Sequence, residues 1–132
     1  MSVPVPKRSK SDLDLFIKAK KLTKYTLTIT SNQNVFFPQY SRLIDEINQL
    51  SIDIFVDLWT ANNLNLFTRS EERLNFQNKA IAKCIRLLAI IDVAQKVFHL
   101  SLRSVAYWGN IIIQIRNLTR AWKNSDNKRK GK

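Results

Sequence analysis

Lysine and arginine recur at helical spacing in three stretches of the chain, and cations arranged in this way can bind phosphate groups. The spacing i, i+4, i+7 places three side chains on one face of a helix. Two rows have it: Lys79, Lys83 and Arg86, and Arg116, Arg120 and Lys123. A third group holds Lys20, Lys21 and Lys24. Like charges one turn apart repel by roughly 0.2–0.5 kcal/mol per pair, so we expect a polyanion to offset the repulsion.

The whole chain is strongly basic. Its 132 residues include 22 Lys and Arg against 10 Asp and Glu, which gives a net charge of +12. Such an excess is typical of proteins that bind nucleic acid, and release of counterions from the phosphates would drive that binding. We therefore expect RNA or DNA as the partner. Two other interpretations stay open: solvated charges without a partner, and a polybasic tail on a membrane surface.

The charge is distributed unevenly, because residues 39–66 carry one cation and four acids. The acids are Asp45, Glu46, Asp53 and Asp57. They would either face a basic helix of a second copy, which predicts a homo-oligomer interface that also includes Trp59, or offset repulsion within one subunit. Both interpretations remain open. Trp108 and Trp122 fit an apolar stripe and are predicted to pack in the core.

Few residues in the sequence have the chemistry that catalysis needs. There is one histidine, His99, at the expected end of a helix, and one cysteine, Cys84, among aliphatic residues that predict its burial. No second histidine, acidic cluster or cysteine pair has metal-ligand spacing. Two glycines cannot form a glycine-rich phosphate loop. We expect no catalytic residue, no metal and no cofactor, and hence no enzyme.

Four helices are expected to position the cation rows. Two glycines and three prolines are too few for the many turns of a β protein. Apolar residues at helical spacing predict helices at residues 11–30, 38–62, 68–98 and 101–124. Helices of this length with short connections favour antiparallel neighbours. The predicted fold class is all-α, an antiparallel up-and-down four-helix bundle.

Local patterns place the helix ends. Pro38 suits the first turn of the second helix, Thr68 to Glu71 form a capping-box pattern before the third, and Ser101 is expected to cap the fourth. Threonines between Tyr25 and Thr30 lower helix propensity, so a strand is a competing interpretation there.

The two ends of the chain are polar and basic. Residues 1–10 and 125–132 are expected to be disordered basic tails on a bundle that spans residues 11–124. The C-terminal tail adds three predicted nucleic-acid-binding cations, which are Lys128, Arg129 and Lys130.

Three short motifs follow one another along the chain. Phe37-Pro38 opens a helix with Arg42 soon after it, Ala61-Asn62 lies near the end of that helix, and a late Ala121-Trp122 precedes the basic C-terminus. In their order and spacing, the chain resembles the accessory variability determinants (Avd) of diversity-generating retroelements, from about residue 12 to 126. It also resembles the four-helix bundle proteins encoded in intervening sequences of bacterial large-subunit ribosomal RNA genes.

The resemblance implies a four-helix protomer in a homopentameric ring whose basic surface includes both cation rows. It also implies partnership with a reverse transcriptase and template RNA during mutagenic cDNA synthesis. The alternative is a structural RNA-binding bundle of the ribosomal intervening-sequence type, without a polymerase partner. No apolar run reaches the roughly 20 residues of a membrane span, and the N-terminus lacks the apolar region of a secretory signal. We therefore expect a cytoplasmic protein without a membrane partner, with the polybasic-tail interpretation as the alternative, and the resemblance implies that it is encoded by a bacterium or a phage.

Overall fold

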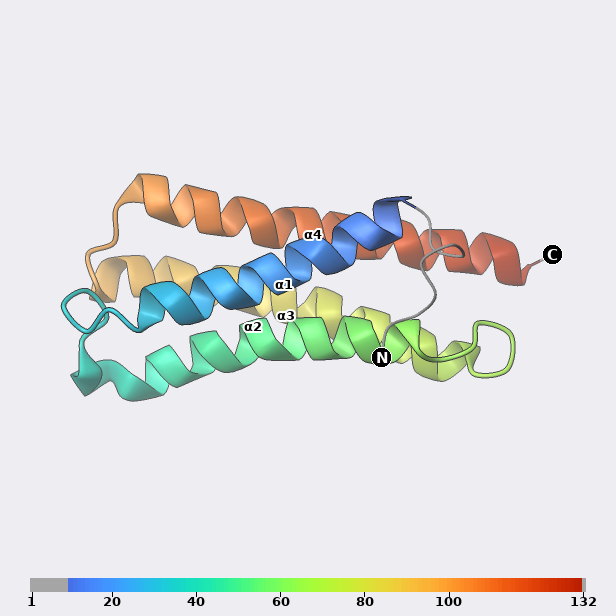
Figure 1. Cartoon of the computed structure of the whole chain (residues 1–132), viewed down its shortest axis with the longest axis horizontal. Helices are drawn as coiled ribbons and strands as arrows, with labels where there is room; N and C mark the ends of the chain where they lie inside the picture. Colours follow the sequence, from blue (N-terminus) through green and yellow to red (C-terminus); the bar gives the residue numbers. More distant parts are fainter. Residues whose placement is uncertain (1–9, 132) are drawn as a thin grey trace.

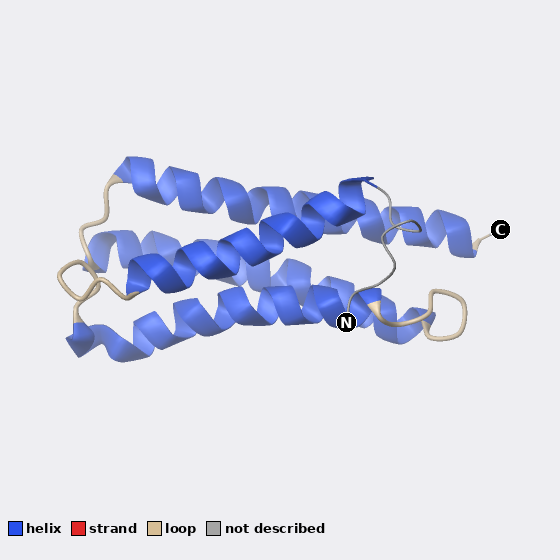
Figure 2. Ribbon diagram, in the orientation of Figure 1, coloured by secondary structure: helices blue, strands red, loops and turns tan. Residues whose placement is uncertain are grey.

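The computed structural model describes residues 10–131, and all regular structure within them is helical. The helices are α1 (Lys10–Thr30), α2 (Ser41–Asn62), α3 (Ser70–Val97) and α4 (Leu102–Lys130), and a short 3-10 helix, η2 (Pro38–Tyr40), precedes α2. Figure 2 shows no strand in this part of the chain. The predicted all-helical class with four helices is confirmed, and the strand interpretation of residues 25–30 is wrong.

The four helices lie along a common long axis and contact one another in cyclic order. Helix α1 contacts α2 and α4, and α3 contacts the same two helices (Figure 1). The loops after α1 and α3 lie at one end of the molecule, and the loop after α2 lies at the other. Each helix therefore buries one face between two neighbours and leaves one face outward.

Apolar residues from all four helices form one core. Each helix contributes a fully buried aliphatic side chain to it, namely Leu22, Ile54, Leu87 and Ile112. Trp108 and Trp122 are buried, with 1% and 4% of their surface exposed, which confirms their predicted place in the core. The Nε1–H of Trp108 donates to Oγ1 of Thr26 at 3.0 Å, so its polar atom has a partner inside the core.

The threonines of α1 do not interrupt the helix. The hydroxyls of Thr23, Thr28 and Thr30 each donate to the carbonyl oxygen four residues earlier, at 3.1, 2.7 and 2.9 Å. These bonds satisfy the hydroxyl groups within the helix and leave its backbone N–H groups free to bond as usual. Oγ1 of Thr30 also lies 2.8 Å from Oδ1 of Asn48, so the two acceptors share its one proton and the end of α1 contacts α2. Packing and these bonds outweigh the low propensity of threonine.

The start of α3 differs from the prediction. The expected capping box at residues 68–71 does not form, because the N-cap residue is Arg69 and it makes no side-chain capping bond. Instead, Oδ1 of Asn65 accepts the backbone N–H groups of Phe67 and Thr68 at 2.8 and 3.1 Å. Asn65 thus takes the backbone N–H of Thr68, which in a capping box would bond the side chain of Glu71.

The connection from α3 to α4 follows the prediction. Oγ of Ser101 accepts the backbone N–H of Ser104 at 3.1 Å, so Ser101 caps α4. His99 has a φ of 54°, and the N–H of Leu100 donates to the carbonyl of Gln95 at 3.1 Å. This bond and the left-handed residue are those of a Schellman motif. His99 is a helix-end residue, as predicted, and its side chain is exposed.

Helix α4 continues past its predicted end at Asn124 and reaches Lys130, so that boundary was wrong. The physical reason lies in Asp126, whose buried carboxylate accepts hydrogen bonds from Arg73 and Gln77 on α3. Three cations in the last turn also lie at the negative end of the helix dipole, which favours them. The predicted N-terminal tail falls almost entirely on residues 1–9, which lie outside the described residues.

Candidate nucleic-acid interface

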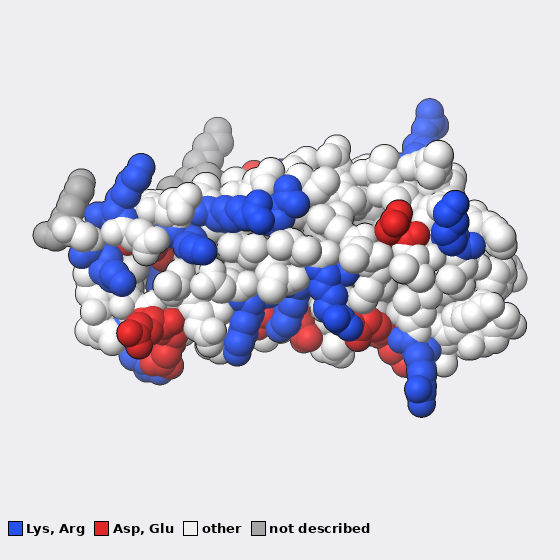
Figure 3. Space-filling view, turned by 180° about the vertical axis from the view of Figure 1, so that it is seen from behind, with Lys and Arg blue, Asp and Glu red and all other residues white. Residues whose placement is uncertain are grey.

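The predicted phosphate-binding cations lie on three helices. The "α4 row" comprises Arg116, Arg120 and Lys123, the "α3 row" comprises Lys79, Lys83 and Arg86, and the "α1 group" comprises Lys20, Lys21 and Lys24. Figure 3 views the side formed by α3 and α4. Lys and Arg atoms form a row in the upper part of this view, and other Lys and Arg atoms adjoin Asp and Glu atoms along its lower edge.

Acids of α2 neutralise most of the α3 row. Nζ of Lys83 lies 2.6 Å from Oδ2 of the buried Asp57, and Nη2 of Arg86 lies 2.6 Å from Oε2 of Glu46. The ammonium of Lys79 lies 4.7 Å from the centre of the Phe76 ring, a cation–π contact. The α3 row therefore offers phosphates less free charge than its sequence implies.

These ion pairs also bear on the predicted oligomer interface. Glu46 and Asp57 have partners within their own chain, as the alternative interpretation of the α2 acids expected. Asp45 is exposed, and Asp53 and Trp59 are half-buried. An oligomer interface that includes these three residues stays a prediction.

The α4 row keeps its charge. Within residues 10–131, no ion pair involves a member of this row. Nε of Arg116 donates to the neutral amide of Asn117 at 3.3 Å, and Nζ of Lys123 donates to that of Asn78 at 2.9 Å. Arg120 is exposed. Amide partners orient the cations without neutralising them, so this surface retains its positive potential.

Cys84 of α3 lies near the α4 row and is completely buried. Burial raises the pKa of its thiol to about 12, and the positive charges of Arg116 and Arg120 oppose this rise. A thiol held neutral is neither a nucleophile nor a metal ligand at neutral pH. The prediction that Cys84 is a buried residue is confirmed.

A buried polar cluster fixes the end of α4 against α3. Nε and Nη2 of Arg73 donate to the two carboxylate oxygens of Asp126 at 2.7 and 3.0 Å, and Nε2 of Gln77 donates to the same carboxylate at 2.8 Å. The guanidinium of Arg73 also lies 4.9 Å from the ring centre of Trp122. This cluster positions the three exposed cations of the last turn of α4, which are Lys128, Arg129 and Lys130.

Sequence patterns did not identify this cluster. Arg73 and Asp126 are 53 residues apart, and neither belongs to a motif. The available signal was that Asp126 is a lone acid within the basic C-terminal segment. Arg129 approaches the same carboxylate at 3.9 Å but is mostly exposed, so it retains most of its charge toward solvent.

The α1 group lies on a different side of the molecule from the α3–α4 face. All three of its lysines are exposed, and Nζ of Lys21 lies 5.6 Å from the ring centre of Tyr107 on α4. Lys20 and Lys24 line a pocket between α1 and α2. The structure thus places the α3 and α4 rows on neighbouring helices and separates the α1 group from them.

The described helices offer no metal centre and no membrane span. Among residues 10–131, no three His, Cys, Asp or Glu side chains come together as a metal site would require. None of the helices in that range combines the length and the apolar composition needed to cross a bilayer.

Comparison with protein-family models, with curated proteins and with solved structures finds no match for this chain.

Proposed function

We propose that this protein is a non-enzymatic nucleic-acid-binding protein whose α4 row contacts phosphates. One observation carries the proposal: the α4 row has only neutral partners or none in residues 10–131, whereas the α3 row is largely paired with acids of α2. Unpaired cations can contact the phosphates of a nucleic acid and release the counterions condensed on it. This release is the main source of sequence-independent affinity.

The length of the charged surface supports the proposal. Arg116, Arg120, Lys123 and Lys130 follow one helical stripe, which spans about 21 Å at 1.5 Å per residue. One strand of a duplex places a phosphate about every 3.4 Å along its axis. A stripe of this length can therefore contact several phosphates in succession.

The proposed biological setting follows from the resemblance. The helices would form an antiparallel up-and-down bundle, which their cyclic contacts and alternating connections support. As an accessory variability determinant, the protein would act in the cytoplasm with a reverse transcriptase and template RNA of a diversity-generating retroelement. A structural RNA-binding bundle of the ribosomal intervening-sequence type would lack the polymerase partner.

Charge reversal tests the α4 row. The test variant is R116E/R120E/K123E, and the matched control is R42E/K96E/R103E, which changes the net charge equally at exposed sites at the end of the bundle where α4 begins. We expect the test variant to lose at least about tenfold in affinity for labelled RNA or duplex DNA in ~100 mM salt. Fluorescence anisotropy measures this, and circular dichroism confirms folding. Equal losses in both variants would show that net charge, and not the α4 row, governs binding.

Affinity purification from the native host tests the setting. Recovery of a reverse transcriptase and its template RNA with the tagged protein is expected. Recovery of ribosomal RNA without a polymerase would favour the structural alternative.

A further inference from the structure

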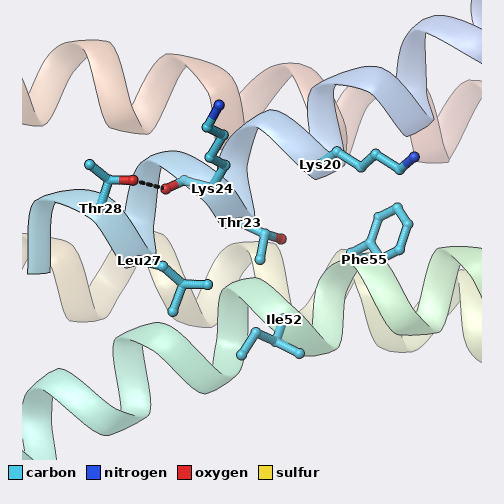
Figure 4. Close-up of a pocket in the computed structure, with 7 residues that line it drawn as sticks. All are labelled: Lys20, Thr23, Lys24, Leu27, Thr28, Ile52 and Phe55. Carbon is cyan, nitrogen blue, oxygen red and sulfur yellow. Dashed lines mark hydrogen bonds between the residues drawn. The ribbon is translucent and has the colours of Figure 1, made fainter. Parts of the chain in front are cut away.

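An apolar groove lies between the outward faces of α1 and α2. Thr23 and Leu27 from α1 and Ile52 and Phe55 from α2 point into the space between the helices (Figure 4). With Lys20, Lys24 and Thr28 they line a pocket of about 440 Å³, and ligand pockets commonly measure about 300–1,000 Å³. Leu27 is 42% exposed, so apolar surface in this groove is open to solvent.

The groove continues along α2 over two aromatic rings. A second pocket of about 270 Å³ is lined by Lys20, Phe55, Val56 and Trp59, and it shares Lys20 and Phe55 with the first. The rings of Phe55 and Trp59 lie 5.8 Å apart with 32° between their planes. Both residues are half-buried and line this pocket, so part of their aromatic surface is open to solvent.

The α1 edge of the groove is cationic. In the part of the chain that the structure describes, no ion pair involves the lysines of the α1 group. Figure 4 shows the side chain of Lys20 extended above Phe55, while that of Lys24 points away from α2 on the same edge. An apolar protein segment in this groove would leave both ammonium groups without a counter-charge. A polynucleotide supplies an apolar base face and an adjacent phosphate together.

We propose that this groove binds unpaired bases of single-stranded nucleic acid, with the bases on Phe55 and Trp59 and the phosphates at Lys20 and Lys24. Aromatic side chains beside a basic edge are the elements by which proteins hold single strands without sequence preference. In a duplex the bases are stacked inside and cannot reach the groove. The inference rests on the proposed function and adds the strandedness of the nucleic acid and a second contact surface.

Tryptophan fluorescence reports on the groove directly. Trp108 and Trp122 are 1% and 4% exposed, so Trp59 is the tryptophan within reach of a solvent-borne base. Short oligo(dT) should quench the emission in a saturable way, and a blunt duplex should not. Trp59→Phe should abolish the quench and keep affinity within about threefold, because phenylalanine still stacks.

Affinity measurements with variants complete the test. F55A/W59A should lose about tenfold or more for oligo(dT) and leave duplex binding unchanged. Phe67→Ala, which removes a 67% exposed aromatic ring outside the groove, should change neither. Lys20→Glu should weaken oligo(dT) binding, and the R116E/R120E/K123E variant should need more oligo(dT) but reach the same quench at saturation.

Failure of the groove is distinguishable from failure of the proposed function. If oligo(dT) and duplex bind through the α4 row without any quench, or if duplex quenches equally, the groove inference is overturned and the proposed function stands. Sedimentation that shows an oligomer disrupted by Trp59→Ala would also overturn it, because a second copy would then occupy the groove.

Discussion

The carboxylate of Asp126 is the most constrained acid among the described residues. It accepts bonds from Arg73 and Gln77, and the side chains of Arg73 and Asp126 are 10% and 6% exposed. Removing one member of a buried, hydrogen-bonded ion pair leaves the other charged and desolvated. Loss of either member would therefore destabilise the packing of α4 on α3, because the other charge would stay buried without a partner.

Asp126→Asn should lower the free energy of unfolding by about 3 kcal/mol, since it leaves the guanidinium of Arg73 buried without its counter-charge. Urea unfolding followed by circular dichroism measures the change. Glu72→Gln, which breaks the exposed pair with Arg69, is the control and should have little effect. Similar losses in the two variants would mean that the buried cluster does not hold α4.

Cys84 should react slowly in the folded protein. Its pKa lies above the ordinary 9.0, at about 12, because burial favours the neutral thiol. The free energy of unfolding should therefore be unaffected by this thiol below about pH 9 and should fall as the pH rises from 9 toward 12, because the unfolded thiol ionises first. Ellman's reagent at about pH 8 should label the native protein far more slowly than the urea-unfolded protein. Equal rates would contradict the burial of this thiol.

For single residues, the sequence predicted which side chains are buried but not which charged side chains form ion pairs. Cys84, Trp108 and Trp122 are buried because their type and their helical spacing demand it. The pairing of Arg73 with Asp126 depends on how α3 and α4 are aligned, and no local pattern of residues specifies that alignment.

Among the helices, local signals decided some ends and failed at others. Ser101 caps α4 as its type and position predict, because its backbone is extended and its Oγ accepts the N–H of Ser104. Thr68 does not cap α3, because the helix begins one residue later with Arg69 as the N-cap, and the N–H of Thr68 bonds Asn65 instead. Helix α4 extends beyond its apolar stripe because the buried cluster around Asp126 continues its contact with α3.

Ser101→Ala should lower stability by about 1 kcal/mol, because the N–H of Ser104 loses its acceptor at the start of α4. Thermal unfolding measures the loss. Ser101→Asp supplies another capping oxygen and should retain most of the stability. If alanine and aspartate were equally tolerated, the cap would contribute nothing.

The α3 row and the α4 row have the same spacing in sequence, but they differ in the partners that the neighbouring helices supply. The α3 row packs beside α2 and finds Asp57 and Glu46 there. The α4 row contacts neutral amides of Asn78 and Asn117. The acidity of α2 was evident from composition, but which basic helix it neutralises depends on the arrangement of the bundle.

For the whole molecule, the net charge of +12 is divided between surfaces of different character. The α4 row and the last turn of α4 form a cationic surface on which, among the described residues, only Arg129 approaches an acid. The α1 group borders an apolar groove with aromatic rings. The first surface suits the phosphates of any nucleic acid, and the second suits exposed bases.

The dependence of binding on salt shows whether the α4 row contacts phosphates, because each contact releases counterions. The affinity for one labelled duplex is measured over a salt series for the wild type, for R116Q/R120Q/K123Q, and for the control R42Q/K96Q/R103Q. Each lost phosphate contact reduces the slope of log K against log salt by about 0.9. We predict a slope shallower by roughly 2–3 for the α4 variant and an unchanged slope for the control. Equal slopes for the α4 variant and the wild type would contradict the account.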